Sequence, residues 1–98
     1  MANANYNKGV RFERAFIKEH SSSYIGLRTA GSHSPVDIIL IPKNAGNVVL
    51  CQLKCYKKGS PKPKIPKSLE QLDAGDEHIT KWFVSKEDYM DYLVEVVK

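Results

Sequence analysis

Apolar residues recur at helical spacing in the first twenty residues and at strand-like density afterwards. Tyr6, Val10 and Ile17 fall on one stripe of a helix from about residue 5 to residue 20, with Phe16 at the edge of that stripe. Three consecutive serines then end the helix. Four later runs are rich in apolar and β-branched residues, which is typical of strands, and they span residues 24–28, 36–41, 48–56 and 79–84.

Two further helices are expected in the second half of the chain. Ser68 and Gln71 have the spacing of a capping box, which predicts a short helix that ends near Gly75. Ser85 and Asp88 are expected to cap a final helix. Its apolar stripe, at i, i+4, i+7 and i+8, consists of Tyr89, Leu93, Val96 and Val97. This order of elements predicts an α/β fold with a mixed central β-sheet flanked by helices, in a single domain over residues 1–98.

Three polar residues interrupt an otherwise apolar hairpin. The turn-forming run from Pro42 to Asn47 is short, so the strands on either side of it are expected to pair antiparallel. Asp37 lies early in the first strand, whereas Gln52 and Lys54 lie late in the second, two residues apart and therefore on one face. If the turn centres near residue 45, Asp37 lies opposite residues 52 to 54. Because polar groups in buried strands need partners, water or an ion, this end of the hairpin is the candidate site.

These residue types suit metal-dependent hydrolysis of a phosphodiester. Mg²⁺ takes hard oxygen ligands, and Asp37 offers a carboxylate, Gln52 a side-chain carbonyl and Leu53 a backbone carbonyl. Lys54 could orient or deprotonate the attacking water, or stabilise charge that develops on the phosphate. Glu13 could hold the ion through water or activate a second water. Taken singly, Asp37 is also explained as a turn aspartate and Lys54 as a solvated strand end, so the prediction rests on the joint arrangement.

Glu13 has a second interpretation from the helix pattern. It lies within the stripe, three residues after Val10 and four before Ile17, where a carboxylate is costly to bury without a partner. The pattern alone favours a position at the margin of the stripe, where Glu13 reaches water and pairs with Arg14 or Arg11.

The charge of the chain favours a polyanionic partner without establishing one. The formal net charge is +4 over 98 residues. The run from Lys57 to Lys67 holds five lysines, three prolines and no acidic residue, which predicts an extended, mobile, basic loop. Because these lysines follow directly after the candidate catalytic strand, they could track a phosphate backbone. The alternative is a solvated linker that only aids solubility.

No run of the sequence suggests export or a membrane anchor. Apolar stretches fall short of the ~20 residues that span a bilayer, and the polar, Asn-rich start does not resemble a signal peptide. We therefore expect an intracellular, cytoplasmic protein that does not engage a membrane. Cys51 and Cys55 are then expected to be thiols, and they are interpreted as small core residues because two cysteines are too few for a zinc or iron–sulfur site. Trp82 and Phe83 are likewise interpreted as core rather than as a base-stacking platform.

The site residues and their surroundings resemble a known nuclease family. Asp37, followed by a turn and then Gln52-Leu53-Lys54, resembles the signature of the PD-(D/E)xK nucleases, in which an aspartate and an ExK or QxK strand form a metal site. Lys8-Gly9 followed by Glu13-Arg14 resembles the opening helix of archaeal-type Holliday junction resolvases. Arg28 to Ser32 resembles their Arg-x-x-Gly-Ser loop before the catalytic aspartate. The resemblance covers about residues 8 to 56.

This resemblance implies a restriction-endonuclease-like fold and a homodimer that cuts two strands of a four-way DNA junction symmetrically. It implies Mg²⁺ as cofactor, with Mn²⁺ able to substitute. The residues with implied catalytic roles are Glu13, Asp37, Gln52, Lys54 and Ser32, of which Glu13, Asp37 and Gln52 are also metal-site groups. DNA contacts are expected, from the resemblance or from charge and position, at Lys8, Arg11, Arg28, His33, Lys57, Lys58, Lys62, Lys64 and Lys67. His33 is equally well explained as a loop residue without a role.

The sequence departs from the resolvase pattern at two positions. Gln52 stands where these resolvases usually have glutamate, which removes a formal charge and predicts weaker metal binding. Pro35 lies two residues before the aspartate rather than next to it. Two other functions therefore stay open: a nuclease of the same superfamily that acts on nicked, flapped or linear DNA, and a non-catalytic DNA-binding module that kept the fold. A structural dimerisation protein with incidental charge would show no salt-dependent DNA binding.

Overall fold

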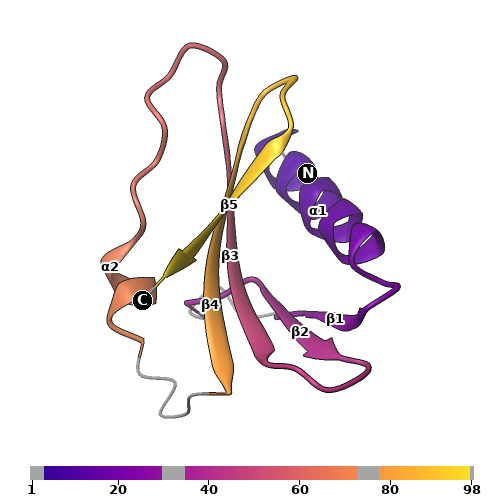
Figure 1. Ribbon diagram of the computed structural model, residues 1–98. Coiled ribbons are helices and arrows are strands. Elements are labelled where there is room, and N and C mark those ends of the chain that lie inside the picture. Colours follow the sequence, from indigo (N-terminus) through magenta and orange to yellow (C-terminus); the bar gives the residue numbers. More distant parts are fainter. Residues whose placement is uncertain (1–3, 30–34, 73–77, 98) are drawn as a thin grey trace.

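A mixed five-stranded sheet forms the centre of the structure, which is a computed structural model. It describes residues 4–29, 35–72 and 78–97, except for the side chains of residues 4–8. The helices are α1 (Ala4–Glu19) and α2 (Lys67–Glu70), and the strands are β1 (Tyr24–Arg28), β2 (Ile38–Pro42), β3 (Val48–Tyr56), β4 (Ile79–Glu87) and β5 (Tyr92–Val97). The strand order is β1-β2-β3-β4-β5, and β3 and β4 pair in parallel while the other neighbours are antiparallel. Figure 1 shows α1 on one side of the sheet and α2 on the other. The predicted α/β class with a mixed sheet flanked by helices is confirmed.

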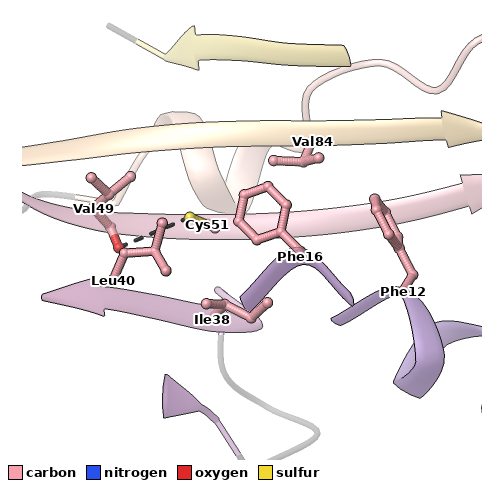
Figure 2. Packing of buried hydrophobic residues seen from close by; sticks show 7 residues of the cluster. All are labelled: Phe12, Phe16, Ile38, Leu40, Val49, Cys51 and Val84. Atoms are coloured by element: carbon pink, nitrogen blue, oxygen red, sulfur yellow. Dashed lines mark hydrogen bonds between the residues drawn. The ribbon is translucent and has the colours of Figure 1, made fainter. Parts of the chain in front are cut away.

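Helix α1 packs on the sheet through Phe12 and Phe16, whereas the predicted apolar stripe had Phe16 only at its edge and did not include Phe12. Phe12 and Phe16 are buried, Phe16 completely, and Figure 2 shows both reaching from α1 toward the strand that carries Cys51. Val10 and Ile17 are only partly buried, and the Tyr6 side chain lies outside the described residues. The stripe is rotated because two aromatic rings one turn apart bury more apolar surface than the aliphatic residues beside them.

A close approach between α1 and β1 depends on a glycine. A Cβ atom at Gly26 would lie 2.7 Å from Cγ2 of Ile17, which is shorter than real Cβ contacts. The missing side chain therefore lets the edge strand lie directly against the helix.

The hairpin of β2 and β3 has the predicted antiparallel pairing. Ile38 pairs with Cys51 and Leu40 with Val49, and the turn contains Gly46 at a φ of 155°. β3 spans the predicted residues, while β2 begins two residues later than predicted. Residue parity divides the faces of β3, because Cys51 packs toward α1 whereas Leu50 packs with Leu69 of α2.

The segment between β3 and β4 crosses the face opposite α1. Helix α2 is only four residues long, begins at Lys67 and has Pro66 as its N-cap, without a side-chain cap. The predicted Ser68 capping box is therefore wrong, and Gly75 lies outside the described residues. Lys81 Nζ donates to three carbonyls near the end of α2, those of Leu69, Glu70 and Leu72, at 3.0 to 3.1 Å. This ammonium satisfies carbonyls that a helix end leaves without partners.

The predicted final helix is wrong, because residues 92–97 form strand β5. Strand β4 continues to Glu87, past the predicted Ser85 cap, and β5 pairs antiparallel with it. The turn between them contains Tyr89 at a φ of 68°, an uncommon conformation for a residue with a side chain. Tyr92 faces α1, where its hydroxyl donates to Oε2 of Glu19 at 2.6 Å. Burial and this carboxylate raise the pKa of Tyr92 to about 12.

The basic loop between β3 and α2 is anchored to the sheet. The Gly59 amide donates to Oε1 of Glu87 at 3.2 Å, Lys62 forms an ion pair with Glu95, and Ile65 packs against the core beneath α2. Residues 57–66 therefore form an extended strap rather than a free linker (Figure 1). Neither helix in the described parts of the chain is long and apolar enough to cross a membrane.

Candidate active site

Asp37 lies at the end of the β2–β3 ladder, where the backbone hydrogen bonds between the two strands stop and the Asp37 side chain accepts the next one. Its amide still donates to the Cys51 carbonyl at 2.8 Å. The next amide of β3 on that side, from Leu53, donates instead to Oδ2 of Asp37 at 2.8 Å. The carboxylate thus takes the place of a strand carbonyl. Continued one residue beyond the Ile38–Cys51 pair, the register puts Asp37 opposite Gln52, within the predicted range of residues 52 to 54.

The pKa of the Asp37 carboxyl is raised above its ordinary value, mainly because burial disfavours the charged form. The Leu53 amide opposes this shift, the negative charge of Glu13 adds to it and the positive charge of Lys54 opposes it. Glu13 and Lys54 therefore both act electrostatically on Asp37, and the structure brings these three predicted residues together. Two nearby carboxylates, one of them partly desolvated, favour a bound cation.

Glu13 is held by an arginine that the helix pattern did not suggest. Nε of Arg28, the last residue of β1, donates to Oε1 of Glu13 at 2.8 Å. The partner is therefore neither Arg14 nor Arg11. This bond joins α1 to the strand next to the hairpin. Arg28 was predicted to contact phosphate, and in this structure its guanidinium also organises the site.

Gln52 supplies a hydrogen-bond acceptor that no described residue uses. Its position on β3 places it on the face away from α1, together with Lys54. Oε1 of Gln52 is fully buried and has no hydrogen-bond partner among the described residues. A buried carbonyl oxygen without a partner is costly, and a hard cation would satisfy it. The described residues hold no cluster of three His, Cys, Asp or Glu side chains that could bind a metal ion.

Lys54 and Leu53 differ in what they present to the site. Lys54 is exposed near the end of β3, on the face that carries Gln52. The Leu53 side chain packs toward α1, and only its backbone reaches the site. Cys51, one residue before Gln52, is buried, and burial together with the Asp37 charge raises its pKa to about 12. This cysteine therefore stays a protonated core thiol, and Cys55 packs on the same side.

Of the remaining predicted site residues, some lie within the described parts of the chain and others do not. Ser32 and His33 lie outside the described residues, as does the side chain of Lys8. Arg11 is exposed on α1. The exposed lysines that follow β3 are Lys57, Lys58, Lys62, Lys64 and Lys67, of which Lys62 is paired with Glu95.

One residue near the site was not predicted from the sequence. Ser85 is the register partner of Lys54 on β4, and it is buried with only 2% of its surface exposed. It had been interpreted as a helix cap, so the pattern placed it on the wrong element. The β-branched residues after position 91 favour a strand there, and such a strand would pair with residues 79–87. That pattern would have predicted Ser85 to lie within a strand rather than at a helix cap.

Comparison with known proteins identifies a similar fold. No family model and no curated protein matches the sequence. Among solved structures, the chain is similar to Hjc of Archaeoglobus fulgidus, a Holliday junction resolvase from an archaeal hyperthermophile, with a TM-score of 0.65 and 19% identity. The alignment covers 89% of this chain and 75% of that chain. The protein therefore has the fold of this resolvase.

Proposed function

We propose that the protein is a Mg²⁺-dependent DNA endonuclease that resolves four-way junctions. What supports the proposal is that Glu13 and Lys54 act electrostatically on Asp37 at one end of the hairpin. Gln52 lies beside Asp37, and its buried Oε1 has no hydrogen-bond partner among the described residues. The fold shared with a Holliday junction resolvase supports the choice of substrate.

In the proposed hydrolysis of a phosphodiester, the site residues have different roles. Asp37, Gln52 and the Leu53 carbonyl would hold the ion, with Glu13 acting directly or through water. When bound, Mg²⁺ supplies a Lewis acid beside the scissile phosphate. Lys54 orients the attacking water and stabilises the negative charge that grows on the phosphate oxygens. The Leu53 amide keeps the Asp37 carboxylate turned toward the site.

Junction resolution requires two cuts, and we propose that a homodimer provides the two sites. Exposed apolar residues lie on the edge strand β1 and its neighbour: Ile25 is 52% exposed, Leu27 49% and Ile41 37%. Ile25 pairs with Ile41, so both lie on the sheet face away from α1. A second copy would cover this apolar surface.

The proposal is tested by cleavage of a labelled synthetic four-way junction with Mg²⁺ or Mn²⁺, beside linear duplex of the same sequence. Paired symmetrical cuts on the junction are expected. Equal cutting of linear duplex would keep the nuclease and reject the junction as its substrate. Binding to the junction without cutting by either metal would leave a DNA-binding module.

Restoring the charge at position 52 is expected to strengthen metal binding. Gln52→Glu adds a carboxylate to the site, and we expect about ten-fold tighter Mg²⁺ binding, equivalent to ~1.4 kcal/mol. Without metal, the same variant should unfold at a lower temperature, because two neighbouring carboxylates repel each other in a partly buried site.

Calorimetric Mg²⁺ titration and thermal melts with and without metal measure both effects. Gln71→Glu makes the same chemical change at an exposed position and should alter neither. Equal Mg²⁺ affinity of the Gln52→Glu variant and the wild-type chain would show that Gln52 is not a metal ligand.

The lysines of the strap are expected to contribute unequally to DNA binding. Lys64→Gln should lower the slope of log affinity against log salt by about 0.9, because one phosphate contact is lost. Lys62→Gln should lower it by less, since Glu95 already neutralises Lys62. Fluorescence anisotropy with a labelled junction across salt concentrations gives both slopes. Identical losses would mean that the Lys62–Glu95 pair opens when DNA binds.

A further inference from the structure

Ser85 is a buried polar residue that neither the core nor the proposed chemistry explains. It lies within β4 with 2% of its surface exposed, directly after the buried apolar residues Phe83 and Val84 in the sequence. Its Oγ atom is buried and has no hydrogen-bond partner among the described residues. Because an unsatisfied buried hydroxyl destabilises a fold, Oγ of Ser85 calls for a hydrogen-bond partner in solution.

The register places this hydroxyl on the face of the proposed active site. Val84 packs with the core under α1, whereas Phe83 packs with Leu69 of α2. By alternation Ser85 lies on the same side as Phe83, away from α1. Lys54 of β3 is its direct neighbour in the parallel ladder, on a strand ~4.8 Å away, and it lies on the same face.

Among the described residues, the other polar side chains near Ser85 on this face are already engaged or lie further off. Glu87 accepts from the Gly59 amide, and Glu95 pairs with Lys62. The β5 residue directly opposite Ser85 is the apolar Leu93. Gln52 is diagonal, because its own β4 partner is Phe83. Lys54 remains: it carries three N–H donors, is exposed, and is the direct register partner of Ser85.

We propose that Ser85 is a positioning residue, whose Oγ accepts a hydrogen bond from Nζ of Lys54 and holds that ammonium over the site. A lysine has four rotatable bonds, and an exposed one samples many positions. A buried acceptor on the neighbouring strand would restrict it to the end of the hairpin where Asp37 and Gln52 lie. The catalytic consequence of this bond rests on the proposed nuclease function, whereas the bond itself does not.

The bond is tested first without DNA or metal. In ¹⁵N-lysine-labelled full chain, the Nζ signal of Lys54 is identified by its loss in Lys54→Met. We expect a high order parameter for this Nζ in the wild-type chain, a clear fall in Ser85→Ala and a return in Ser85→Thr, which restores a hydroxyl. The Nζ of Lys43, an exposed lysine in the β2–β3 turn, should not change. A Lys54 Nζ as mobile in the wild-type chain as in Ser85→Ala overturns the inference.

Cleavage kinetics then test the consequence. Ser85→Ala is expected to lower kcat about ten-fold, the scale of losing a contact behind an active-site group, with KM and junction affinity unchanged because Ser85 is buried away from DNA. Ser85→Thr should recover most of kcat. A restored signal in Ser85→Thr combined with an inactive wild-type chain would reject the nuclease and keep the bond. Full activity in Ser85→Ala would reject the positioning role.

Discussion

The Asp37→Asn variant is expected to lose about a thousand-fold in junction cleavage and yet to unfold at a higher temperature than the wild-type chain. The loss of activity follows because the Asp37 side chain, which accepts from the Leu53 amide, would no longer carry the negative charge that attracts a cation. Removal of one essential electrostatic contact at an active site commonly costs about 10²–10³ in rate. Asparagine keeps an oxygen for the Leu53 amide, so the local fold should persist.

The gain in stability follows from the raised pKa of Asp37. Burial makes the ionised carboxylate unfavourable in the folded chain, so the metal-free protein loses stability as the pH rises through the folded pKa. Below the ordinary aspartate pKa of about 3.9 the carboxyl is protonated in both states and the effect is absent. The higher melting temperature of Asp37→Asn should therefore be seen at pH 7 and should disappear near pH 3.

Thermal melts in a chelator, taken from pH 3 to pH 8, measure this dependence beside the cleavage assay. Asp91→Asn is the matched control, since Asp91 is exposed in the turn before β5, and it should leave both cleavage and the stability profile unchanged. A stability loss in Asp37→Asn at pH 7 would mean that the carboxylate is stabilised by its neighbours in the metal-free chain. If Asp37→Asn retained cleavage, the reaction would not take place at the hairpin end.

The local pattern was sufficient for the hairpin and for the position of Asp37. β1 and β3 have the predicted bounds, because a run of apolar and β-branched residues between turn signals depends little on the rest of the chain. The short turn then decides the register, and the register alone brings Asp37 opposite Gln52. This part of the site was therefore accessible without the structure.

The last strand was misjudged because two signals compete within residues 85–97. Spacings of four, seven and eight residues among apolar side chains match a helix, and Ser85 with Asp88 resembles an N-terminal cap. The same residues also alternate, since Tyr92 packs toward α1 while Val97 packs beneath α2. The edge of β4 offers a ladder of backbone partners to this segment, and β-branched valines favour the strand.

Contacts between elements distant in sequence could not be predicted from spacing. The Glu13 partner is fifteen residues away on β1, whereas local reasoning could only weigh the neighbouring arginines. Ser85 becomes a neighbour of Lys54 only through parallel pairing of β3 and β4, which a crossover of some twenty residues creates. The orphaned oxygen of Gln52 is likewise a property of packing. The sequence therefore indicates candidate groups for the site, whereas their contacts depend on the tertiary fold.

The Phe16→Ala variant is expected to lose about 3–5 kcal/mol of unfolding free energy. Phe16 is completely buried, its ring lies 5.4 Å from that of Tyr92 and 6.5 Å from that of Phe12, and it contacts the strands on which the site is built. A cavity at this place would remove the main attachment of α1 to the sheet (Figure 2). A chain of this size has a total stability of about 5–15 kcal/mol, so the loss is a large part of it.

Because α1 carries Glu13, this variant should also weaken the site before the chain unfolds. Urea denaturation should show the stability loss, and a melting temperature lower by at least about 12 °C should accompany it. Cleavage measured well below that temperature should fall further than the folded fraction alone explains, since a loosened α1 no longer holds Glu13 beside Arg28 and Asp37. Met90→Ala, at a residue that is 56% exposed, should cost no more than about 0.5 kcal/mol. A loss of under ~1 kcal/mol in Phe16→Ala would show that α1 is held elsewhere, and Glu13 would then owe its position to the Arg28 bond rather than to the aromatic core.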